Sequence, residues 1–308
     1  MSKFVILEIG DIDNKQCYPV ALRIGDSINS SIIESRGYLP PVTDFLKSYN
    51  NLQQSRSQCG FGSTRALQHI NKGQITKTSV RKLATEVKEN INTWLNSGDS
   101  LFRPVRDKLL QVLSAERASV RLMIQTDDVE LWGWPWHLWD ILDKDKIEPI
   151  FSRLTNSVSN NLRINPKDKV RILVILGENT DINVQADLEI LKGVIQYNAE
   201  IEELTAIRSS QLNEQLWERN WDILFFAGHS SSKPTFSQGT LFLNEDENIP
   251  IEDLKRSLEN AIKHGLKLAI FNSCDGMGLV RELASLQIPA VIAMRERVPD
   301  EVAQKFLE

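Results

Sequence analysis

The spacing of apolar residues predicts two strands at the start of the chain and a helical stretch after them. Apolar runs at 4–9 and 18–24 flank the polar stretch 11–15, a pattern typical of a β-hairpin. Residues 44 to about 115 are polar and helix-like, and within them apolar residues recur at spacings of 3, 4, 4 and 3, which predicts an amphipathic helix. These apolar residues are Val80, Leu83, Val87, Ile91 and Trp94. The mostly apolar run 120–125 predicts a further strand.

From about residue 166 the pattern becomes regular and predicts strands that alternate with helices. The near-continuous apolar run 170–176, rich in β-branched residues, is typical of a strand buried on both faces. Ser210 is expected to cap one of the following helices, and Pro250 and Gly265 to open and close another. The other predicted strands are 199–204, 223–227, 268–271 and 290–294, with a short extra strand at 240–243. The alternation predicts an α/β fold with a mostly parallel sheet and helices on both faces.

These patterns of apolar and polar residues divide the chain into three regions. We expect an N-terminal β-hairpin extension at 1–43, a helical and Trp-rich region at 44–165, and the regular α/β region at 166–308. The first two make up a mixed α/β N-terminal part. Residues 131–139 hold four of the seven tryptophans, and such a cluster could stack on carbohydrate or nucleic acid. Because no Lys or Arg is interleaved with them, we expect them to form a packing seam between domains.

Composition excludes several classes of protein. The net charge of −5 and the lack of a long Lys/Arg run argue against a nucleic-acid partner. No apolar run is long enough for a signal peptide or a membrane-spanning helix. Three cysteines without metal-ligand spacing exclude a disulfide framework, so we expect a cytoplasmic protein with no metal and no cofactor. The chain also contains no phosphate-binding glycine loop and no GxSxG motif.

The residues that follow the predicted parallel strands are the candidates for chemistry, because ligands bind beyond the carboxyl ends of such strands. His229 comes just after the strand 223–227, and Cys274 just after the strand 268–271. If these strands are neighbours, they lie about 4.8 Å apart and the two side chains can meet. A cysteine that a histidine activates is a common nucleophile in acyl transfer. Cys274 also precedes a predicted helix, whose N-terminus favours a thiolate, whereas Cys17 and Cys59 have no such setting.

Two motifs in this arrangement resemble the CHAT domain, a bacterial caspase-like family related to caspases, metacaspases and separases. They are Phe-Phe-Ala-Gly-His-Ser at 225–230 and Phe-Asn-Ser-Cys-Asp-Gly at 271–276, with Cys274 placed 45 residues after His229. The stretch Trp-Pro-Trp-His-Leu-Trp-Asp at 134–140 is similar to a Pro-Trp-containing segment of that family. The likeness covers residues 85–308, most clearly 168–308, and the opening hairpin resembles an extension seen in some members.

The resemblance implies a caspase-like fold and hydrolysis of peptide bonds through a thiol intermediate, in bacterial signalling. At the matching positions Cys274 would be the nucleophile and His229 the general base and acid. The backbone N–H groups of Ser230 and Cys274 would form the oxyanion hole. The expected partner is a protein or peptide substrate, with the activity latent until a stimulus or a regulatory protein opens the site.

Two departures from the family pattern qualify this hypothesis. Relatives that cleave after basic residues carry an acid two positions before the cysteine, where this chain has the neutral Asn272. Asn272 and Asp275 are the candidates for the substrate pocket, and a preference for Arg or Lys would need Asp275 or another carboxylate. The family domain also usually continues beyond the predicted helix at 298–308, where this sequence stops. We therefore expect a truncated domain, with either a regulatory protein or a missing C-terminal sensor region as its partner.

Two alternatives stay open at this point. The same fold without cleavage would be a regulatory, protein-interaction module, which Asn272 and the short C-terminal part favour. A receiver-like or nucleotide-binding domain would use Asp181 and Asp187, but it needs a lysine after the fifth strand. The chain has Arg295 and Arg297 there, which are poor substitutes.

Overall fold

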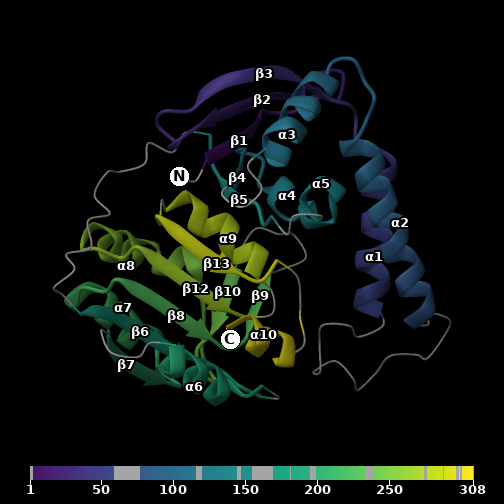
Figure 1. The fold of residues 1–308 in the computed structure, drawn as a ribbon. Coiled ribbons are helices and arrows are strands. Elements are labelled where there is room, and N and C mark those ends of the chain that lie inside the picture. The colour runs from purple at the N-terminus through teal and green to yellow at the C-terminus, as the bar shows by residue number, and fades with distance from the viewer. Residues whose placement is uncertain are drawn as a thin grey trace. The chain divides into compact units, whose positions relative to one another are not determined.

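The fold is that of a computed structural model (Figure 1). It describes residues 3–58, 77–115, 120–143, 147–154, 169–180, 182–194, 199–232, 239–273, 276–286, 288–295, 298 and 300–307. By their contacts the residues divide into two compact units. The first contains Met1–Cys59 and Asn71–Ser157, and the second contains Gly60–Ile70 and Val158–Glu308. Among the described helices, none is long and apolar enough to cross a membrane.

The first unit is built on a five-stranded sheet of order β3-β2-β1-β4-β5. Its strands are β1 (Lys3–Ile9), β2 (Tyr18–Gly25), β3 (Ile32–Leu39), β4 (Val120–Gln125) and β5 (Ile150–Ser152). The predicted hairpin of β1 and β2 is confirmed as an antiparallel pair, and β4 lies parallel to β1 as its other neighbour. The strands β3 and β5 were not predicted. Residues of the hairpin and of the Trp-rich region thus share one sheet.

Helices of the first unit pack around one apolar core. They are α1 (Asp44–Gln58), α2 (Lys77–Leu95), α3 (Arg103–Ala115), α4 (Val129–Trp132), the 3-10 helix η1 (Trp136–Leu138) and α5 (Asp140–Asp143). The predicted amphipathic stripe of α2 is confirmed, because Val87, Ile91 and Trp94 are buried in this core. Leu109 and Leu113 of α3 lie in the same cluster. Spacing by three and four residues therefore identified the inward face of α2.

The Trp-rich segment belongs to the core of the first unit. Trp134, Trp136 and Trp139 are buried there, and Trp134 contacts Phe45 and Trp94 edge-on with ring centroids 5.2 and 5.4 Å apart. The expected packing role is confirmed, but the aromatic partners lie inside this unit and not in a seam between domains. The reason is that α1 and α2 contribute Phe45 and Trp94 as partners for Trp134, and the sequence of residues 131–139 alone does not reveal these partners.

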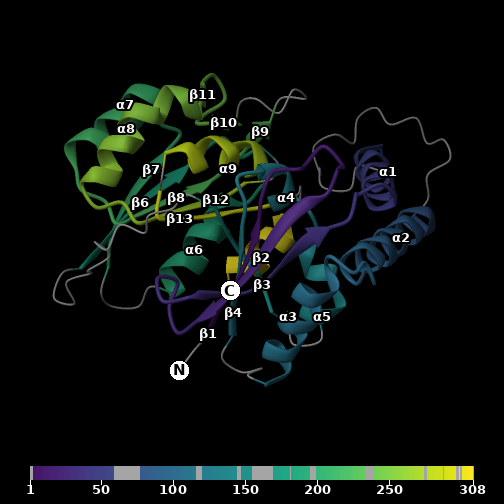
Figure 2. The same ribbon diagram turned by 90° about the horizontal axis from the view of Figure 1, so that it is seen from above.

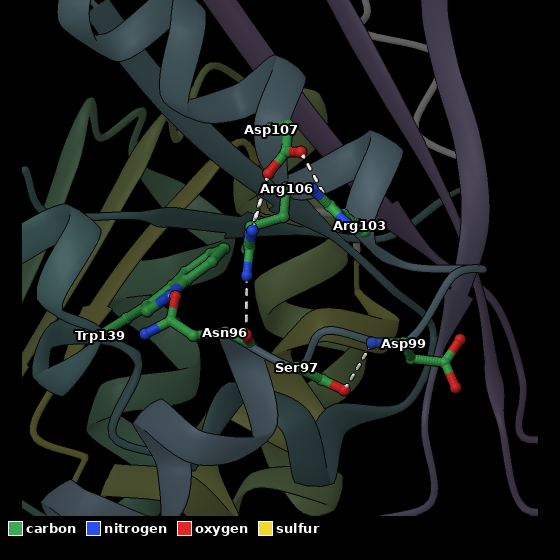
Figure 3. A network of polar contacts seen from close by, with 7 residues as sticks. All are labelled: Asn96, Ser97, Asp99, Arg103, Arg106, Asp107 and Trp139. Atoms are coloured by element: carbon green, nitrogen blue, oxygen red, sulfur yellow. Dashed lines mark hydrogen bonds and ion pairs between the residues drawn. The ribbon is translucent and has the colours of Figure 1, made fainter.

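A polar network closes the end of α2 against α5 and α3 (Figure 3). The Asn96 amide accepts a hydrogen bond from Trp139 Nε1 at 3.1 Å and donates one to Asp140 at 2.9 Å. Its backbone carbonyl accepts a bond from Arg106 at 2.7 Å. Arg106 also contacts Asp107 at 2.8 Å. Trp139 is buried, and among the described residues Asn96 is the hydrogen-bond partner of its indole N–H.

The second unit contains the predicted α/β sheet, with order β13-β12-β8-β6-β7 and all neighbours parallel. Its strands are β6 (Val170–Leu176), β7 (Ala199–Thr205), β8 (Ile223–Ala227), β12 (Leu268–Asn272) and β13 (Ala290–Ala293). A small antiparallel sheet of β9 (Ser230–Ser232), β10 (Gly239–Phe242) and β11 (Asn248–Pro250) follows β8. All five strands of the main sheet were predicted within two residues at each end.

Helices cover both faces of the main sheet, as the alternation predicted (Figure 2). They are α6 (Val184–Val194), α7 (Ser209–Glu218), α8 (Ile251–Lys263), α9 (Gly276–Ser285) and α10 (Asp300–Leu307). Apolar residues of α7, α8 and α9 pack with Leu173 and Ile175 of β6, and those of α6 pack with Ile172, Val174 and Leu176. Strand β6 is therefore buried on both faces, which explains its continuous apolar run.

Two predicted helix ends have different outcomes. Helix α8 follows Pro250 and is closed by Gly265, whose positive φ of 120° suits the residue after a helix C-terminus, so both predictions are confirmed. The predicted cap Ser210 is wrong, because α7 begins at Ser209 and Arg208 is its N-cap. The backbone N–H of Arg208 instead donates to the side chain of Gln211, at 2.9 Å. Gln211 thus supplies one half of a capping box, and the N–H of Ser209 at the start of the helix donates to the carboxylate of Glu247 at 3.0 Å.

Candidate functional site

The site lies at the carboxyl edge of the main sheet, where the strand order reverses. In chain order the strands run 2-1-3-4-5 across the sheet, so β6 and β8 are neighbours whose connections leave in opposite directions. Such a reversal leaves room beyond the strand ends, and ligands of open α/β sheets bind there. The loops after β6 and β8 begin with Gly177 and Gly228. They bring together the residues described next.

His229 is the centre of the described part of this site. It follows β8 by two residues, and its side chain is 14% exposed. Its ring nitrogen Nε2 lies 3.0 Å from the carbonyl oxygen of Thr180 and 3.1 Å from Oε2 of Glu178. The ring meets Phe242 edge-on, with centroids 6.5 Å apart. Because both oxygens accept, Nε2 carries the hydrogen of the neutral ring.

The backbone holds the same residues in place. The Glu178 N–H donates to the Phe242 carbonyl at 2.9 Å, and the His229 N–H donates to the Glu178 carbonyl at 3.2 Å. The Phe242 N–H in turn donates to the His229 carbonyl at 3.0 Å. The close approach of β10 to the loop after β6 requires glycine at position 177, since a Cβ there would lie 2.4 Å from the Phe242 carbonyl oxygen. The loop after β6, the loop after β8 and strand β10 are therefore locked to one another.

The end of β12 lies beside the end of β8. The two strands are parallel neighbours, as the sequence reasoning required, and Asn272 pairs in register with Ala227. Ser273 is buried, and its hydroxyl lies 2.8 Å from the hydroxyl of Ser230, which donates to it. Cys274 and Asp275 lie outside the described residues, and the described chain resumes at Gly276, the first residue of α9. The structure thus places His229, Ser230 and Asn272 at one sheet edge.

Asn272 lies over the α6 face of the sheet and contacts an acidic side chain. It is 5% exposed, and its side chain faces the carboxyl group of Asp187 of α6, itself 2% exposed. Burial, and next the negative charge of Asp300, raise the pKa of Asp187 to about 7, against the lowering effect of the nearby Asn272 amide. Oδ1 of Asp187 and Oδ1 of Asn272 have no hydrogen-bond partner among the described residues.

Sequence reasoning missed Glu178 and the link from Asp187 to Asn272. Glu178 stands in the loop 177–181, where the sequence reasoning gave a role only to Asp181, in the receiver-like alternative. Its contact with His229 depends on β6 being next to β8, and that order cannot be read from apolar runs. Asp187 enters the sequence reasoning only through a receiver-like domain, in which Asn272 has no part.

A hollow in this unit lies away from His229. A cavity of about 420 Å³ is lined by residues at the amino ends of β6 and β7 and at the end of α7. Its charged side chains pair with each other, Arg219 with Glu202 at 3.3 Å and Arg171 with Glu200 at 3.8 Å. Ligands of open α/β sheets bind at the opposite edge, so His229 marks the better candidate. Over the described part of the chain no cluster of three or more His, Cys, Asp or Glu could hold a metal ion.

Comparison with known proteins agrees with this picture. No curated protein matches the sequence at a significant level. The family model of the CHAT domain matches residues 96–308, more than half of the chain. The match takes in α3, β4, the Trp-rich segment and the whole described main sheet. The parallel sheet flanked by helices is consistent with the caspase-like fold of this peptidase-related domain. The chain belongs to the CHAT domain family.

Proposed function

We propose that the chain is a cysteine endopeptidase of caspase-like type, with Cys274 as nucleophile and His229 as general base and acid. The observation that carries the proposal is the hydrogen bond between Ser230 and Ser273 at 2.8 Å. Ser230 directly follows His229, and Ser273 directly precedes Cys274. Consecutive Cα atoms are about 3.8 Å apart, so this bond between the neighbours of His229 and Cys274 supports the proposal that the two residues work as a pair.

The contacts of the His229 ring support its role as a base. The Nε2–H group donates to the Thr180 carbonyl and the Glu178 carboxylate, so the neutral ring carries its lone pair on Nδ1. Nδ1 has no partner among the described residues. A nitrogen of this kind can accept the proton of a nearby thiol, and a third group that orients the ring from behind is the usual companion of such a base.

The proposed reaction proceeds in two steps. The Cys274 thiol gives its proton to Nδ1 of His229, and the thiolate sulfur forms a bond to the carbonyl carbon of the peptide. The C–N bond then breaks as the histidine returns the proton to the leaving amine, which leaves a thioester. Water attacks the thioester, one proton goes through the histidine to the sulfur, and a carboxylate product departs. No cofactor takes part in this sequence.

The remaining roles follow the family pattern. The backbone N–H groups of Ser230 and Cys274 are proposed to stabilise the oxyanion, where one donor is typically worth about 3 kcal/mol. Asn272 and Asp275 are proposed for the pocket of the side chain before the cleaved bond. The substrate is a protein or peptide, and the site is latent until a partner or stimulus opens it.

A peptidyl electrophile tests this proposal. The protein is incubated with a mixture of peptidyl acyloxymethyl ketones that vary in the residue next to the warhead, and the modified cysteine is mapped by mass spectrometry. We expect one adduct, on Cys274, that disappears in both Cys274→Ala and His229→Ala. Cys17 is the matched control, since it is partly exposed and its thiol donates a hydrogen bond to the Lys15 carbonyl at 3.7 Å. Cys17→Ser should leave the adduct unchanged.

The opposite results would point to the non-cleaving alternative. Adducts spread evenly over Cys17, Cys59 and Cys274, or an adduct on Cys274 that is indifferent to His229→Ala, would mean that the dyad is absent. The chain would then act as a regulatory module that binds protein partners through the same fold.

A further inference from the structure

Glu178 is held against His229 more firmly than an accidental neighbour would be. Its side chain is 14% exposed, and Oε2 lies 3.1 Å from His229 Nε2. The other oxygen, Oε1, accepts a hydrogen bond from the backbone N–H of Thr180 at 2.7 Å. Its own N–H and carbonyl are bonded to Phe242 and His229. Both carboxylate oxygens of Glu178, its N–H and its carbonyl are therefore held by contacts with residues around the His229 ring.

The Glu178 carboxylate differs from the Thr180 carbonyl in bringing a negative charge to the His229 ring. The Thr180 carbonyl and the Glu178 carboxylate both accept from Nε2, so either can set the ring orientation. Only the carboxylate carries a full negative charge, and it favours the imidazolium that forms when the ring takes a proton. Among the described residues, the others with a recorded contact to the ring, Thr180 and Phe242, are neutral. Partial burial strengthens this interaction relative to water.

We propose that Glu178 is a positioning residue for the dyad, which acts through His229 by orienting the ring and stabilising its protonated form against the Cys274 thiolate. This inference rests on the proposed function, because it needs Cys274 and His229 to work as a pair. We assign Glu178 a role only through the His229 ring. It sets how much of the thiol is ionised near neutral pH.

The pH profile of cysteine alkylation separates charge from structure. The rate constant for modification of Cys274 by iodoacetamide is measured from pH 6 to pH 10 in the wild type and in Glu178→Gln. Glutamine keeps the shape of the side chain but only one of the two acceptor oxygens, so this change removes the charge and one of the two hydrogen bonds. We expect the rate at pH 7 to fall about tenfold, the equivalent of about one pH unit. At pH 10 the thiol ionises without help, and the two rates should agree within about twofold.

The control is Glu203→Gln, which removes a carboxylate of β7 that pairs with Lys192 and does not contact the ring. Its profile should follow the wild type. Glu178→Gln overturns the inference if its rate is unchanged at pH 7, or if it is lowered by the same factor at both ends of the range, as a purely structural defect would do. A failure of the proposed function looks different, because then His229→Ala itself would leave the Cys274 rate unchanged.

A second measurement needs no variant at position 178. Long-range ¹H–¹⁵N spectra of histidine side chains distinguish the two neutral tautomers, and His229→Ala identifies the resonances. We expect His229 to carry its hydrogen on Nε2 above neutral pH in the wild type. A hydrogen on Nδ1 would mean that neither Glu178 nor Thr180 accepts from the ring, and would overturn the inference even if Glu178→Gln did not fold.

Discussion

Replacing Asp187 by asparagine should stabilise the folded protein at pH 8 and lose this effect as the pH falls to 5. Asp187 is 2% exposed on α6, and one of its oxygens has no hydrogen-bond partner among the described residues. Its carboxyl group also faces the charge of Asp300, which is held by the Asn183 N–H at 3.2 Å and by Gln304 at 2.9 Å. An ionised Asp187 is therefore buried beside another carboxylate, whereas an amide of the same shape carries no charge.

The size of the effect follows from the pKa of Asp187. Burial and Asp300 raise it from 3.8 to about 7, so the folded state holds this proton more tightly than the unfolded state. The stability that comes from protonation is complete below about pH 4 and is lost as the pH rises through about 7. Between pH 5 and pH 8 the loss amounts to about 2.5 kcal/mol. The asparagine side chain of the variant has no proton to lose, so the difference in unfolding free energy between variant and wild type should change by that amount.

Urea unfolding at pH 5, 6, 7 and 8 measures this difference, with far-UV circular dichroism as the signal. Hydrogen exchange of α6 and β6 assigns the transition to the second unit. The matched variant Asp246→Asn, at an exposed position before β11, should show no comparable change with pH. A difference between Asp187→Asn and wild type that stays constant from pH 5 to pH 8 would refute the reasoning, because it would mean that Asp187 ionises equally in the folded and unfolded states.

Two further substitutions test how the site and the first unit are held. Gly177→Ala would bring a methyl group 2.4 Å from the Phe242 carbonyl oxygen, so we expect a loss of about 1–3 kcal/mol in urea unfolding and slower alkylation of Cys274; unchanged stability would show that β10 can move without cost. Asn96→Ala leaves the buried Trp139 N–H without its partner and should cost about 1–3 kcal/mol, seen as earlier urea unfolding by tryptophan fluorescence. The variant Asp140→Asn, which leaves the indole acceptor in place and keeps an acceptor for the Asn96 amide, should lose less, and equal losses would contradict this assignment.

The parts of the fold that were predictable are those in which burial dictates the pattern. Strand β6 reads as a continuous apolar run because helices cover both of its faces, and its bounds were predicted without error. Strand β3 was missed because its sequence, Ile32–Leu39, is mostly polar or exposed and lies at the edge of its sheet. The N-terminus of α7 was placed at the wrong residue because the N–H of Ser209, its first residue, donates to Glu247, which lies 38 residues further along the chain. Edges and caps depend on neighbours that a local pattern does not contain.

The candidate site shows the same division. His229 could be found because a polar residue directly after a buried strand stands at the sheet edge where ligands bind. The fold and the family are confirmed, while the roles of Cys274, His229, Ser230, Asn272 and Asp275 stay predictions. Glu178 could not be assigned from the sequence, since it lies 51 residues before His229 and meets it only through the β6–β8 neighbourhood. Long-range pairing of this kind is what the three-dimensional structure adds.

The most direct test of the dyad is the rate at which iodoacetamide modifies Cys274 at pH 7 in the wild type and in His229→Ala. Mapping by mass spectrometry separates this thiol from Cys17 and Cys59. If His229 takes the thiol proton, the rate for Cys274 should fall at least about tenfold in His229→Ala, a loss of about 1.4 kcal/mol or more in thiolate stabilisation. The rates for Cys17 and Cys59 should not change. Equal Cys274 rates in the two proteins would contradict the dyad and the peptidase mechanism built on it.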